Sequence, residues 1–303
     1  MDLPNDYYDQ NDSDNVCHLC GKPKYKVECE VETYDFPFTF KECQCGMIKQ
    51  TPMPNKKFFE WFFNSDLFFS AQKTQNKRIW GFYDYFKDEP CRLATSAARY
   101  KYFDKFLGEN SRIIKIGPST GTFLYEAKKH GHDAIGSDIS STFVDYAREH
   151  YDVHIDLGRF EEQPYEDASF DAVFLFNVIE NIPNLFDFLK AVRAKLKVGG
   201  IFALNHVEIE HNIIKMLQKS KYFMYRPPIC YMFTSKVLER MLNDNGFEVV
   251  EQRRDVRYMH LEKILTLLHW EKAFKAITPL GIHNIPFPIY AYPSKITVAR
   301  RVS

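Results

Sequence analysis

The fold is decided by residues 112–140, which read RIIKIGPSTGTFLYEAKKHGHDAIGSDIS. The apolar run RIIKIG predicts a short buried strand, and the GPSTG that follows predicts a glycine turn opening a helix over 122–130. DAIGSD, at 133–138, predicts a second strand ending in Asp138. A strand, a glycine turn, a helix and another strand make up the βαβ unit of a parallel sheet.

The same alternation continues on both sides of this unit. The segment FDAVFLFNV, at 170–178, is the most apolar, as expected of a strand in the middle of a sheet that helices cover on both faces. Other strands are predicted at 153–157, 201–207, 247–254 and 295–300, and helices at 94–107, 140–150, 184–196 and 235–245. The pattern therefore predicts an α/β fold with an open, doubly wound, Rossmann-like sheet.

The glycine turn indicates what kind of ligand the sheet would bind. Gly117 and Gly121 let a ligand approach the backbone beside the start of a helix. Asp138 ends the next strand, where a carboxylate can accept both hydroxyls of a ribose. Gly121 is not followed by the Lys-Ser or Lys-Thr pair of a P-loop, which argues against a nucleoside triphosphate. The spacing predicts a ligand that carries a nucleoside.

Five of the seven cysteines lie in the first 45 residues, and four of these five form two pairs that are each followed by glycine. The pairs are Cys17 with Cys20 and Cys43 with Cys45. This spacing predicts a tetrahedral zinc site in a ribbon, and four protein ligands make the site structural because they leave no open position. A disulfide or unrelated free thiols are the alternative, and Cys29 or His18 could replace one ligand.

Aromatic residues make up 16% of the chain and crowd into residues 56–85, with rings such as Phe58, Phe59 and Phe62. We favour helical packing of this stretch against the following domain. The alternative is that some of its rings form the wall of a substrate pocket, since pockets form preferentially between domains. The stretch could also bury a homodimer contact.

Composition excludes several classes of protein. Forty basic residues balance forty acidic ones, so the strong basic excess of a nucleic-acid-coating protein is absent. No apolar run reaches the roughly 18 residues of a membrane span. Residues 1–15 are acidic and polar, unlike a secretory signal, so we expect a disordered tail and a cytoplasmic location. After the tail we expect a zinc ribbon (16–50), an aromatic helical connector (51–92) and the α/β domain (93–303), with an insertion at about 211–233 over the pocket mouth.

Residues 112–208 resemble the class I S-adenosylmethionine-dependent methyltransferases. IKIGPSTGTFLYEAKKHGHDAIGSDIS is similar to the glycine motif and ribose-binding acid of that family, and GRFEEQPYEDASFDAVFLFNVIENIPNLFDFLKAVRAKLKVGGIFAL is similar to its next stretch. The resemblance implies a seven-stranded sheet whose last strand is antiparallel, between strands five and six. The CxxC…CxC ribbon, with MLNDNGFEVVE, RYMHLEKIL and KITVARR near the end, resembles a subgroup with an N-terminal zinc module that acts on sugars, nucleotide sugars or other small metabolites.

The resemblance also implies roles for individual residues. Gly117 and Gly121 would line the methionine part of the cofactor, and Asp138 would bind the ribose. Ile139, Arg159 and Phe160 would surround the adenine. Asn177 and Val178 would form the floor beneath the sulfonium. This chain departs from the family pattern at Lys115, where an acid is usual, and at Pro118, Arg159 and Asn181.

Methyl transfer needs a nucleophile held in line with the methyl group and, where necessary, a base. The candidate bases are Glu180 after the fourth strand, His206 at the end of the fifth, and Tyr231 and His211 in the insertion. The leading hypothesis is methylation of oxygen or carbon in a sugar or related small molecule. A catalytically silent binding protein is the second, and an RNA methyltransferase whose ribbon binds RNA is the third. The lack of a basic run in 16–50 argues against RNA.

Overall fold

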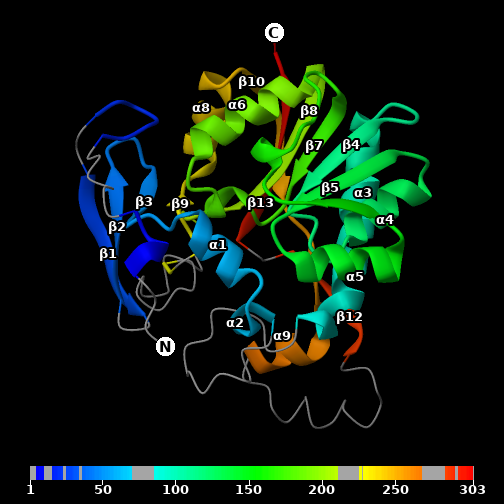
Figure 1. Cartoon of the computed structure of the whole chain (residues 1–303), viewed down its shortest axis with the longest axis horizontal. Coiled ribbons are helices and arrows are strands. Elements are labelled where there is room, and N and C mark those ends of the chain that lie inside the picture. The colour runs from blue at the N-terminus through cyan, green and yellow to red at the C-terminus, as the bar shows by residue number, and fades with distance from the viewer. Residues whose placement is uncertain are drawn as a thin grey trace.

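The main feature of the computed structural model is a seven-stranded sheet, in which the strand order is β10-β13-β8-β7-β4-β5-β6 (Figure 1). The structure describes residues 5–9, 16–22, 25–33, 36–69, 85–210, 225–226, 228–267, 284–290 and 293–302. The strands are β4 (Arg112–Ile116), β5 (Asp133–Asp138), β6 (His154–Leu157), β7 (Phe170–Leu175), β8 (Leu196–Val207), β10 (Phe247–Arg254) and β13 (Ser294–Arg301).

Strand order reverses at β4, which pairs in parallel with β5 on one side and with β7 on the other. In open sheets of this kind, ligands bind outside the carboxyl ends of the strands at such a reversal. At the other end of the sheet, β13 lies between β8 and β10 and is antiparallel to both. The expected doubly wound fold with an antiparallel last strand is confirmed.

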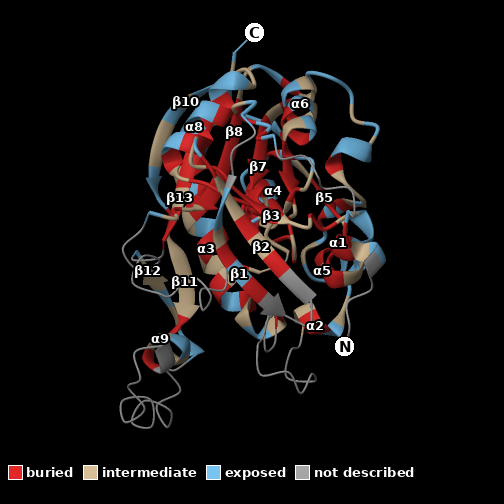
Figure 2. Cartoon of the chain, turned by 90° about the vertical axis from the view of Figure 1, so that its left-hand side faces the viewer, coloured by how far each residue is buried: buried red, intermediate tan, exposed pale blue. Residues whose placement is uncertain are grey.

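Helices cover both faces of this sheet, as expected. On one face, Tyr100 and Phe103 of α3 and Phe123 of α4 pack against the strands, together with Phe174 of β7. On the other face, α6 and α8 pack against β4, β7 and β8. Figure 2 shows the buried residues concentrated between these layers. The helices are α3 (Glu89–Phe103), α4 (Thr122–Lys129), α5 (Ser141–Tyr151), α6 (Leu185–Lys195) and α8 (Ser235–Asp244).

A second, four-stranded sheet contains most of the predicted ribbon, in the order β1-β2-β3-β9 (Figure 1). Its strands are β1 (Tyr25–Thr33), β2 (Phe36–Cys43), β3 (Ile48–Thr51) and β9 (Tyr231–Met232). β9 comes from the insertion far along the chain, and Met232 pairs with Ile48 and Tyr231 with Lys49. The ribbon sheet therefore includes a strand from the α/β half of the sequence.

The aromatic connector forms α1 (Lys56–Phe62) and α2 (Asp66–Phe69) between the two sheets. Asn55 caps α1, because its side-chain oxygen accepts a hydrogen bond from the Phe58 N–H. Phe58 and Phe62 are fully buried in the same core cluster as α6 and α8. Part of the expected disordered tail is ordered: Tyr8 is buried and forms a β-bridge with Pro54. Residues 70–84 of the connector lie outside the described residues.

The remaining elements lie beside α3 or between the larger ones. They are β11 (Arg257–His260), α9 (Leu261–Leu267) and β12 (Pro286–Ile289), with 3-10 turns at Asn5–Tyr7, Phe86–Asp88, Asp104–Phe106, Phe160–Glu162 and Ile179–Asn181. Among the described residues, no helix has both the length and the apolar character needed to cross a bilayer.

Candidate active site

A cavity of about 640 Å³ lies at the carboxyl ends of β4, β5 and β7, where the strand order reverses. This volume is in the range of small-molecule sites, roughly 300–1,000 Å³. Of the residues predicted to bind a cofactor, seven line the cavity: Gly117, Asp138, Ile139, Arg159, Phe160, Asn177 and Val178. These seven come from four separate loops, so the fold brings together what the sequence separates.

Glycine is needed at the two glycine positions of the turn for different structural reasons. Gly117 has φ +60°, and a Cβ there would lie 2.6 Å from Cγ2 of Val178, which makes glycine necessary in the cavity wall. Gly121 has φ +86°, and a Cβ there would lie within 3.0 Å of Val153 and Ala147. Among the described residues that line the cavity, Gly121 is not found. Glycine is required here by close packing against Ala147 of α5 and Val153, the residue before β6.

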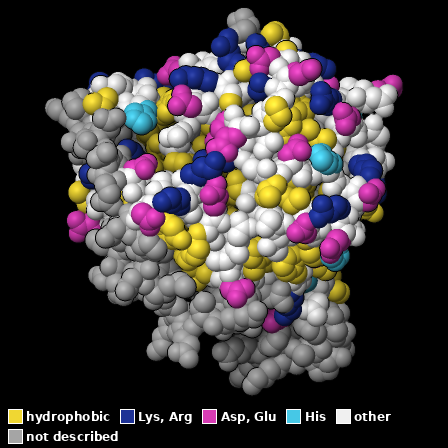
Figure 3. Space-filling model, viewed as in Figure 1, with side chains coloured by type: hydrophobic (Ala, Val, Ile, Leu, Met, Phe, Trp, Pro, Cys, Tyr) yellow, Lys and Arg dark blue, Asp and Glu magenta, His cyan; other side chains and the backbone are white. Residues whose placement is uncertain are grey.

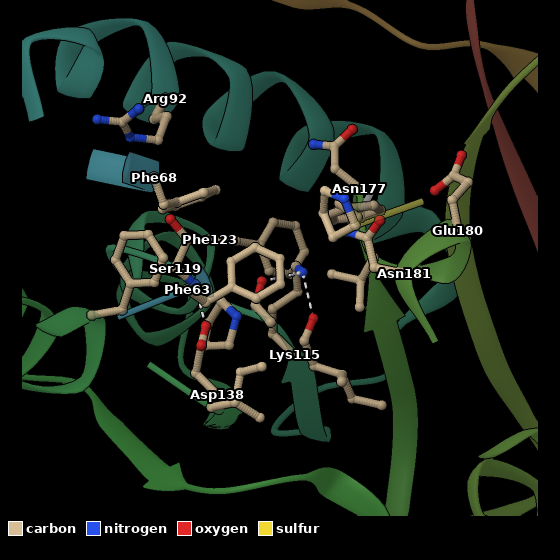
Figure 4. A pocket seen from close by; sticks show the side chains of 18 of the residues that line it. Phe63, Phe68, Arg92, Lys115, Ser119, Phe123, Asp138, Asn177, Glu180 and Asn181 are labelled. Atoms are coloured by element: carbon tan, nitrogen blue, oxygen red, sulfur yellow. Dashed lines mark hydrogen bonds between the residues drawn. The ribbon is translucent and has the colours of Figure 1, made fainter. Parts of the chain in front are cut away.

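Asp138 organises the loops around it through its carboxylate. One oxygen accepts a hydrogen bond from the Ser119 N–H and the other from the Ser140 N–H, both at 3.0 Å. Burial raises the pKa of Asp138 to about 6, although these two N–H groups favour the charged form. A carboxylate has about four acceptor sites, so both oxygens can still accept ribose hydroxyls. Figure 4 shows this carboxylate beside Ser119 at the cavity wall.

Ile139 and Arg159 lie where one end of the cavity meets a second hollow of about 250 Å³. Nε of Arg159 is buried and has no hydrogen-bond partner among the described residues. Asn64, just after α1, donates a hydrogen bond to the Ile139 carbonyl and accepts one from the Ser141 N–H. The connector thus fixes the loop that follows β5, a contact that the sequence did not predict.

The floor of the cavity is fixed by a buried polar network under Asn177. Asn177 has φ +57°, and Asn205 holds it twice, by accepting from its N–H and donating to its side-chain oxygen. Asn205 also donates to Asp255, which forms a buried ion pair with Arg99 of α3. Because Asn177 adopts a backbone conformation that is uncommon outside glycine, these contacts explain how the turn is maintained.

Glu180 is the candidate base that lines the cavity. One carboxylate oxygen accepts a hydrogen bond from the Val207 N–H at 2.8 Å. Burial raises the pKa of Glu180 to about 7, with this hydrogen bond opposing the shift. The neighbouring Asn181 also lines the cavity, and its side-chain oxygen has no partner among the described residues.

The other predicted bases are not brought to the site. His206 is 1% exposed, and its Nε2 lies 3.4 Å from Oγ of Ser235. Tyr231 is buried, and its hydroxyl donates to the Pro183 carbonyl at 2.9 Å. Neither is found among the described residues that line the cavity. The structure therefore does not bring His206 or Tyr231 to the cavity surface. His211 lies outside the described residues.

Much of the wall is aromatic, and the connector supplies a large part of it. Phe59 and Phe62 pack in the core, as favoured for the Phe-rich stretch, and they also line the cavity. The aromatic lining residues are Phe59, Phe62, Phe63, Phe68, Tyr85, Phe123, Phe143, Phe160, Phe176 and Phe188. Of the insertion, Arg226, Pro228 and Ile229 line the cavity, and residues 211–224 and 227 lie outside the described residues.

Two lining cations were missed as site residues or misjudged. Arg99 lies on the face of α3 that also carries Thr95 and Ser96, four and three residues earlier. Polar residues at this spacing on a helix face that is buried were the sequence signal that could have identified Arg99 as a site residue. Lys115 is buried at 4% exposure and lines the cavity, where it donates hydrogen bonds to the Ile116 and Gly117 carbonyls. Pro118 is buried and packs against Gly136. A Cβ added to Gly136 would lie 2.7 Å from Cγ of Pro118, so there is no room for a side chain at Gly136.

The four cysteines predicted to bind zinc form one cluster outside the cavity. Their sulfur atoms all lie within 4.8 Å of one another. Cys17 Sγ is 3.6 Å from Cys45 Sγ, and Cys20 Sγ is 3.5 Å from Cys43 Sγ. A tetrahedral site with Zn–S bonds of about 2.3 Å has sulfur atoms about 3.8 Å apart. The donor set and its spacing therefore fit a zinc ion.

Comparison with known proteins identifies the family. Residues 85–252, more than half of the chain, match the methyltransferase domain family. The chain belongs to this family, and its α/β domain is an S-adenosylmethionine-dependent methyltransferase domain of class I.

Relatives agree with this assignment at low identity. The chain is 26% identical over 194 residues to sterol 24-C-methyltransferase of Candida albicans, covering 57% of this chain and 51% of that protein. It is 23% identical over 180 residues to the biotin biosynthesis bifunctional protein BioHC of Cellvibrio japonicus, covering 58% and 34%. The chain thus spans about half or less of the length of these curated relatives. Magnesium protoporphyrin IX methyltransferase of Synechocystis PCC 6803, solved with bound SAH, shares the fold at 14% identity and a TM-score of 0.52, over 82% of this chain and all of that one.

Proposed function

We propose that the chain transfers the methyl group of S-adenosylmethionine to oxygen or carbon of a small metabolite of the saccharide type. The observation that carries this proposal is the convergence of the Gly117 turn, the Asp138 carboxylate and Glu180 on one cavity. A nucleoside-binding edge and a candidate base in the same cavity are what a transferase needs, because the reacting groups must be held together.

The residues present fit the adenosyl part of such a cofactor. Asp138 would hold the ribose, Ile139 and Phe160 would flank the adenine, and the unpartnered Nε of Arg159 would donate to a ring nitrogen. Gly117, Asn177 and Val178 would form the surface under the amino-acid tail. When bound, the cofactor supplies an already activated methyl group, so the protein has only to position the acceptor and accept its proton.

The acceptor would lie against the aromatic wall. Ring faces pack against the apolar face of a sugar, and charged side chains at the same wall can bond its hydroxyls. Arg92 and Asp88 line the cavity, and the Arg92 guanidinium lies 4.0 Å from the centre of the Tyr85 ring, whose hydroxyl forms a hydrogen bond with Oγ of Ser119. Figure 4 shows Arg92 and Phe68 near each other at the cavity wall.

Glu180 would act as the base that removes the acceptor proton. A carboxylate with a pKa near 7 is a stronger base than an ordinary one and is still largely ionised in weakly alkaline solution. Its second oxygen is not held by the Val207 N–H and would face the acceptor.

We propose that the cysteine cluster holds a structural zinc ion. Four thiolates complete a tetrahedral shell and leave no position for a substrate, so the metal would stabilise the ribbon and take no part in methyl transfer.

The test is direct. Purified, zinc-loaded protein is incubated with methyl-labelled S-adenosylmethionine and a panel of free sugars, nucleotide sugars and other small hydroxylated metabolites, and products are followed by mass spectrometry. Gain of one methyl group by a sugar supports the proposal. Transfer only to RNA or protein, or to none of the panel while the cofactor binds, would refute the saccharide assignment.

One observation favours a second candidate, a binding protein without methyltransferase activity. Lys115 places a cation in the cavity, and a cationic sulfonium nearby would be repelled. Calorimetry separates the two functions. Heat of binding for neither S-adenosylmethionine nor S-adenosylhomocysteine would leave only the fold in common with the enzymes.

A further inference from the structure

Lys115 has an unusual position for a lysine. It lies in the central strand β4, opposite Gly136 of β5 and Phe174 of β7, and only 4% of it is exposed. Its ammonium donates hydrogen bonds to the Ile116 carbonyl at 2.8 Å and to the Gly117 carbonyl at 3.0 Å. An ammonium has three donors, so one remains.

No carboxylate of the described residues lies within 4.0 Å of the Lys115 ammonium, although buried charges are normally paired. The charges that act on this amine are Arg99, which is also cationic and lowers its pKa, and Asp138, which opposes that shift. The cavity therefore holds a buried amine that has no ion-pair partner in the described part of the chain.

Arg99 provides a second cation beside it. The Arg99 guanidinium lies 4.5 Å from the centre of the Phe176 ring, and the Lys115 amine lies 5.0 Å from the centre of the same ring. Asp255 accepts from Nε and one terminal nitrogen of Arg99, and the other terminal nitrogen has no partner among the described residues. Both cations line the cavity, so each offers it a free donor.

The position of this pair relative to Asp138 suggests its ligand. Gly117 lies between Lys115 and Asp138, because it follows β4 directly and its N–H donates a hydrogen bond to the Ser137 carbonyl, next to Asp138. A ribose at Asp138 would extend its 5′ substituent across Gly117 toward Lys115 and Phe176. Figure 4 shows the Lys115 amine between Asp138 and Asn177.

We propose that Lys115 and Arg99 form a carboxylate subsite, which recognises the tail of the nucleoside ligand by its carboxylate and not by its amino group. The subsite rests on the proposed function, because it assumes a nucleoside at Asp138. Two convergent donors on cationic groups match the two oxygens of a carboxylate. They oppose the ammonium that the same tail carries.

Binding should also change the protonation of the subsite. Burial, with Arg99 adding to it, lowers the pKa of Lys115 to about 7, so most of the amine is neutral at pH 8. A carboxylate beside it favours the charged form, so ligand binding at pH 8 should take up a proton.

The test uses the full-length, zinc-loaded protein and isothermal titration calorimetry. The ligands are S-adenosylhomocysteine, its decarboxylated and deaminated analogues, and 5′-methylthioadenosine. Loss of the carboxylate should weaken binding by about 10-fold to 100-fold, the range for a hydrogen bond to a charged group. Loss of the amino group should change it by less than about 3-fold or strengthen it. Proton uptake is measured by repeating the titration in buffers of different ionisation enthalpy.

Substitutions of Lys115 test the subsite with Arg99 left in place. Lys115→Met keeps the length of the side chain in a buried position, and should reduce the difference in affinity between S-adenosylhomocysteine and the decarboxylated analogue and abolish proton uptake. Lys115→Glu should reverse the preference toward the amino group. Lys105→Met is the matched control, because Lys105 also lies over an aromatic ring, at 4.7 Å from Tyr102, but is exposed.

The outcomes distinguish this subsite from the adenosyl pocket. If 5′-methylthioadenosine binds while the wild-type protein ignores the carboxylate, the subsite is refuted and the nucleoside pocket survives. If none of the adenosyl ligands binds, the proposed function itself fails. If Lys115→Met keeps the carboxylate preference but loses methyl transfer, the amine acts on the acceptor and the subsite assignment is wrong.

Discussion

The two sheets of this molecule depend on different sources of stability. The seven-stranded sheet is covered by helices on both faces, and its strands β4 and β7 are buried at all but one position each. The ribbon sheet consists of β1, β2 and β3 from the ribbon and β9 from the insertion in the larger domain. Residues of the ribbon belong to the same core cluster as the larger domain. A module of about thirty residues cannot bury enough surface to fold alone, so we expect it to need both its metal and its neighbour.

Although the two sheets differ in this way, backbone hydrogen bonds join the ribbon to the candidate active site. Gln50 of β3 donates to the Cys230 carbonyl at 2.8 Å, and the Cys230 N–H donates to the Glu180 carbonyl at 2.7 Å. Two hydrogen bonds thus connect a ribbon strand to the candidate base. Loss of ribbon structure should therefore disturb the cavity as well.

The largest effect is expected from removing one cysteine of the cluster. Cys43→Ser should abolish stoichiometric zinc and unfold the ribbon, because structural zinc contributes about 10–16 kcal/mol of apparent binding free energy in small fingers. Metal analysis and hydrogen exchange of residues 25–51 measure this. Cys29→Ser is the control, since Cys29 is buried but outside the cluster. Equal zinc in both variants would contradict the assignment.

Replacing Glu180 tests the residue at which the two regions meet. Glu180→Gln should lower the rate of methyl transfer by about 10²-fold to 10⁴-fold, the usual contribution of a general base. With a pKa near 7, wild-type kcat/KM should rise with pH up to about 7 and then level off, since only the ionised carboxylate accepts a proton. The variant should lack this rise, whereas Glu166→Gln, at an exposed site, should keep it.

A glycine pair tests the tight packing of the larger domain. Gly121→Ala should lower the free energy of unfolding by about 2–5 kcal/mol, because the new Cβ overlaps Val153 and Ala147 at a positive φ. Gly199→Ala meets nothing within 4 Å at a similar φ, so only about 1–2 kcal/mol is expected. Urea unfolding of both variants gives the comparison. Similar losses would mean that backbone conformation, not packing, sets the cost.

The smallest effect is expected at an exposed ion pair between the connector and the larger domain. Nζ of Lys56 lies 2.7 Å from Glu162, and both side chains are about half exposed. A double-mutant cycle with Lys56→Ala and Glu162→Gln should give a coupling of about 0.2–1 kcal/mol that falls as salt is added. Lys57→Ala, whose partner Asp6 lies in the N-terminal tail, should show no coupling to Glu162. A large, salt-independent coupling would overturn this expectation.

The sequence predicts the larger domain well because its signals are local. The strand that ends at Ile116, the positive-φ glycine after it and the apolar strand β7 each follow from neighbouring residues, and the structure has them within a few residues of the expected bounds. The antiparallel β13 followed from the family resemblance, since the pairing of distant strands has no local signal.

The candidate site was predicted only in part, because side-chain direction depends on tertiary packing. His206 and Glu180 both lie near strand ends, yet one is enclosed by Ser235 and Phe233 while the other faces the cavity. In the sequence Lys115 is a departure from the family pattern, whereas its burial in the same cavity as Arg99 is visible only in the structure. Surface charges, by contrast, are mixed in sign over the face drawn in Figure 3, in line with a neutral composition.

The pairing of β9 with β3 limits how this chain can be divided. Shortening the protein to its catalytic half would leave Tyr231 and Met232 without their hydrogen-bonded neighbour and would bare the apolar surface now under α1. Unpaired strand edges beside apolar surface promote aggregation. Replacing this ribbon with another would therefore require the insertion that carries β9 to be replaced as well. We expect these two distant segments to be inherited as one unit.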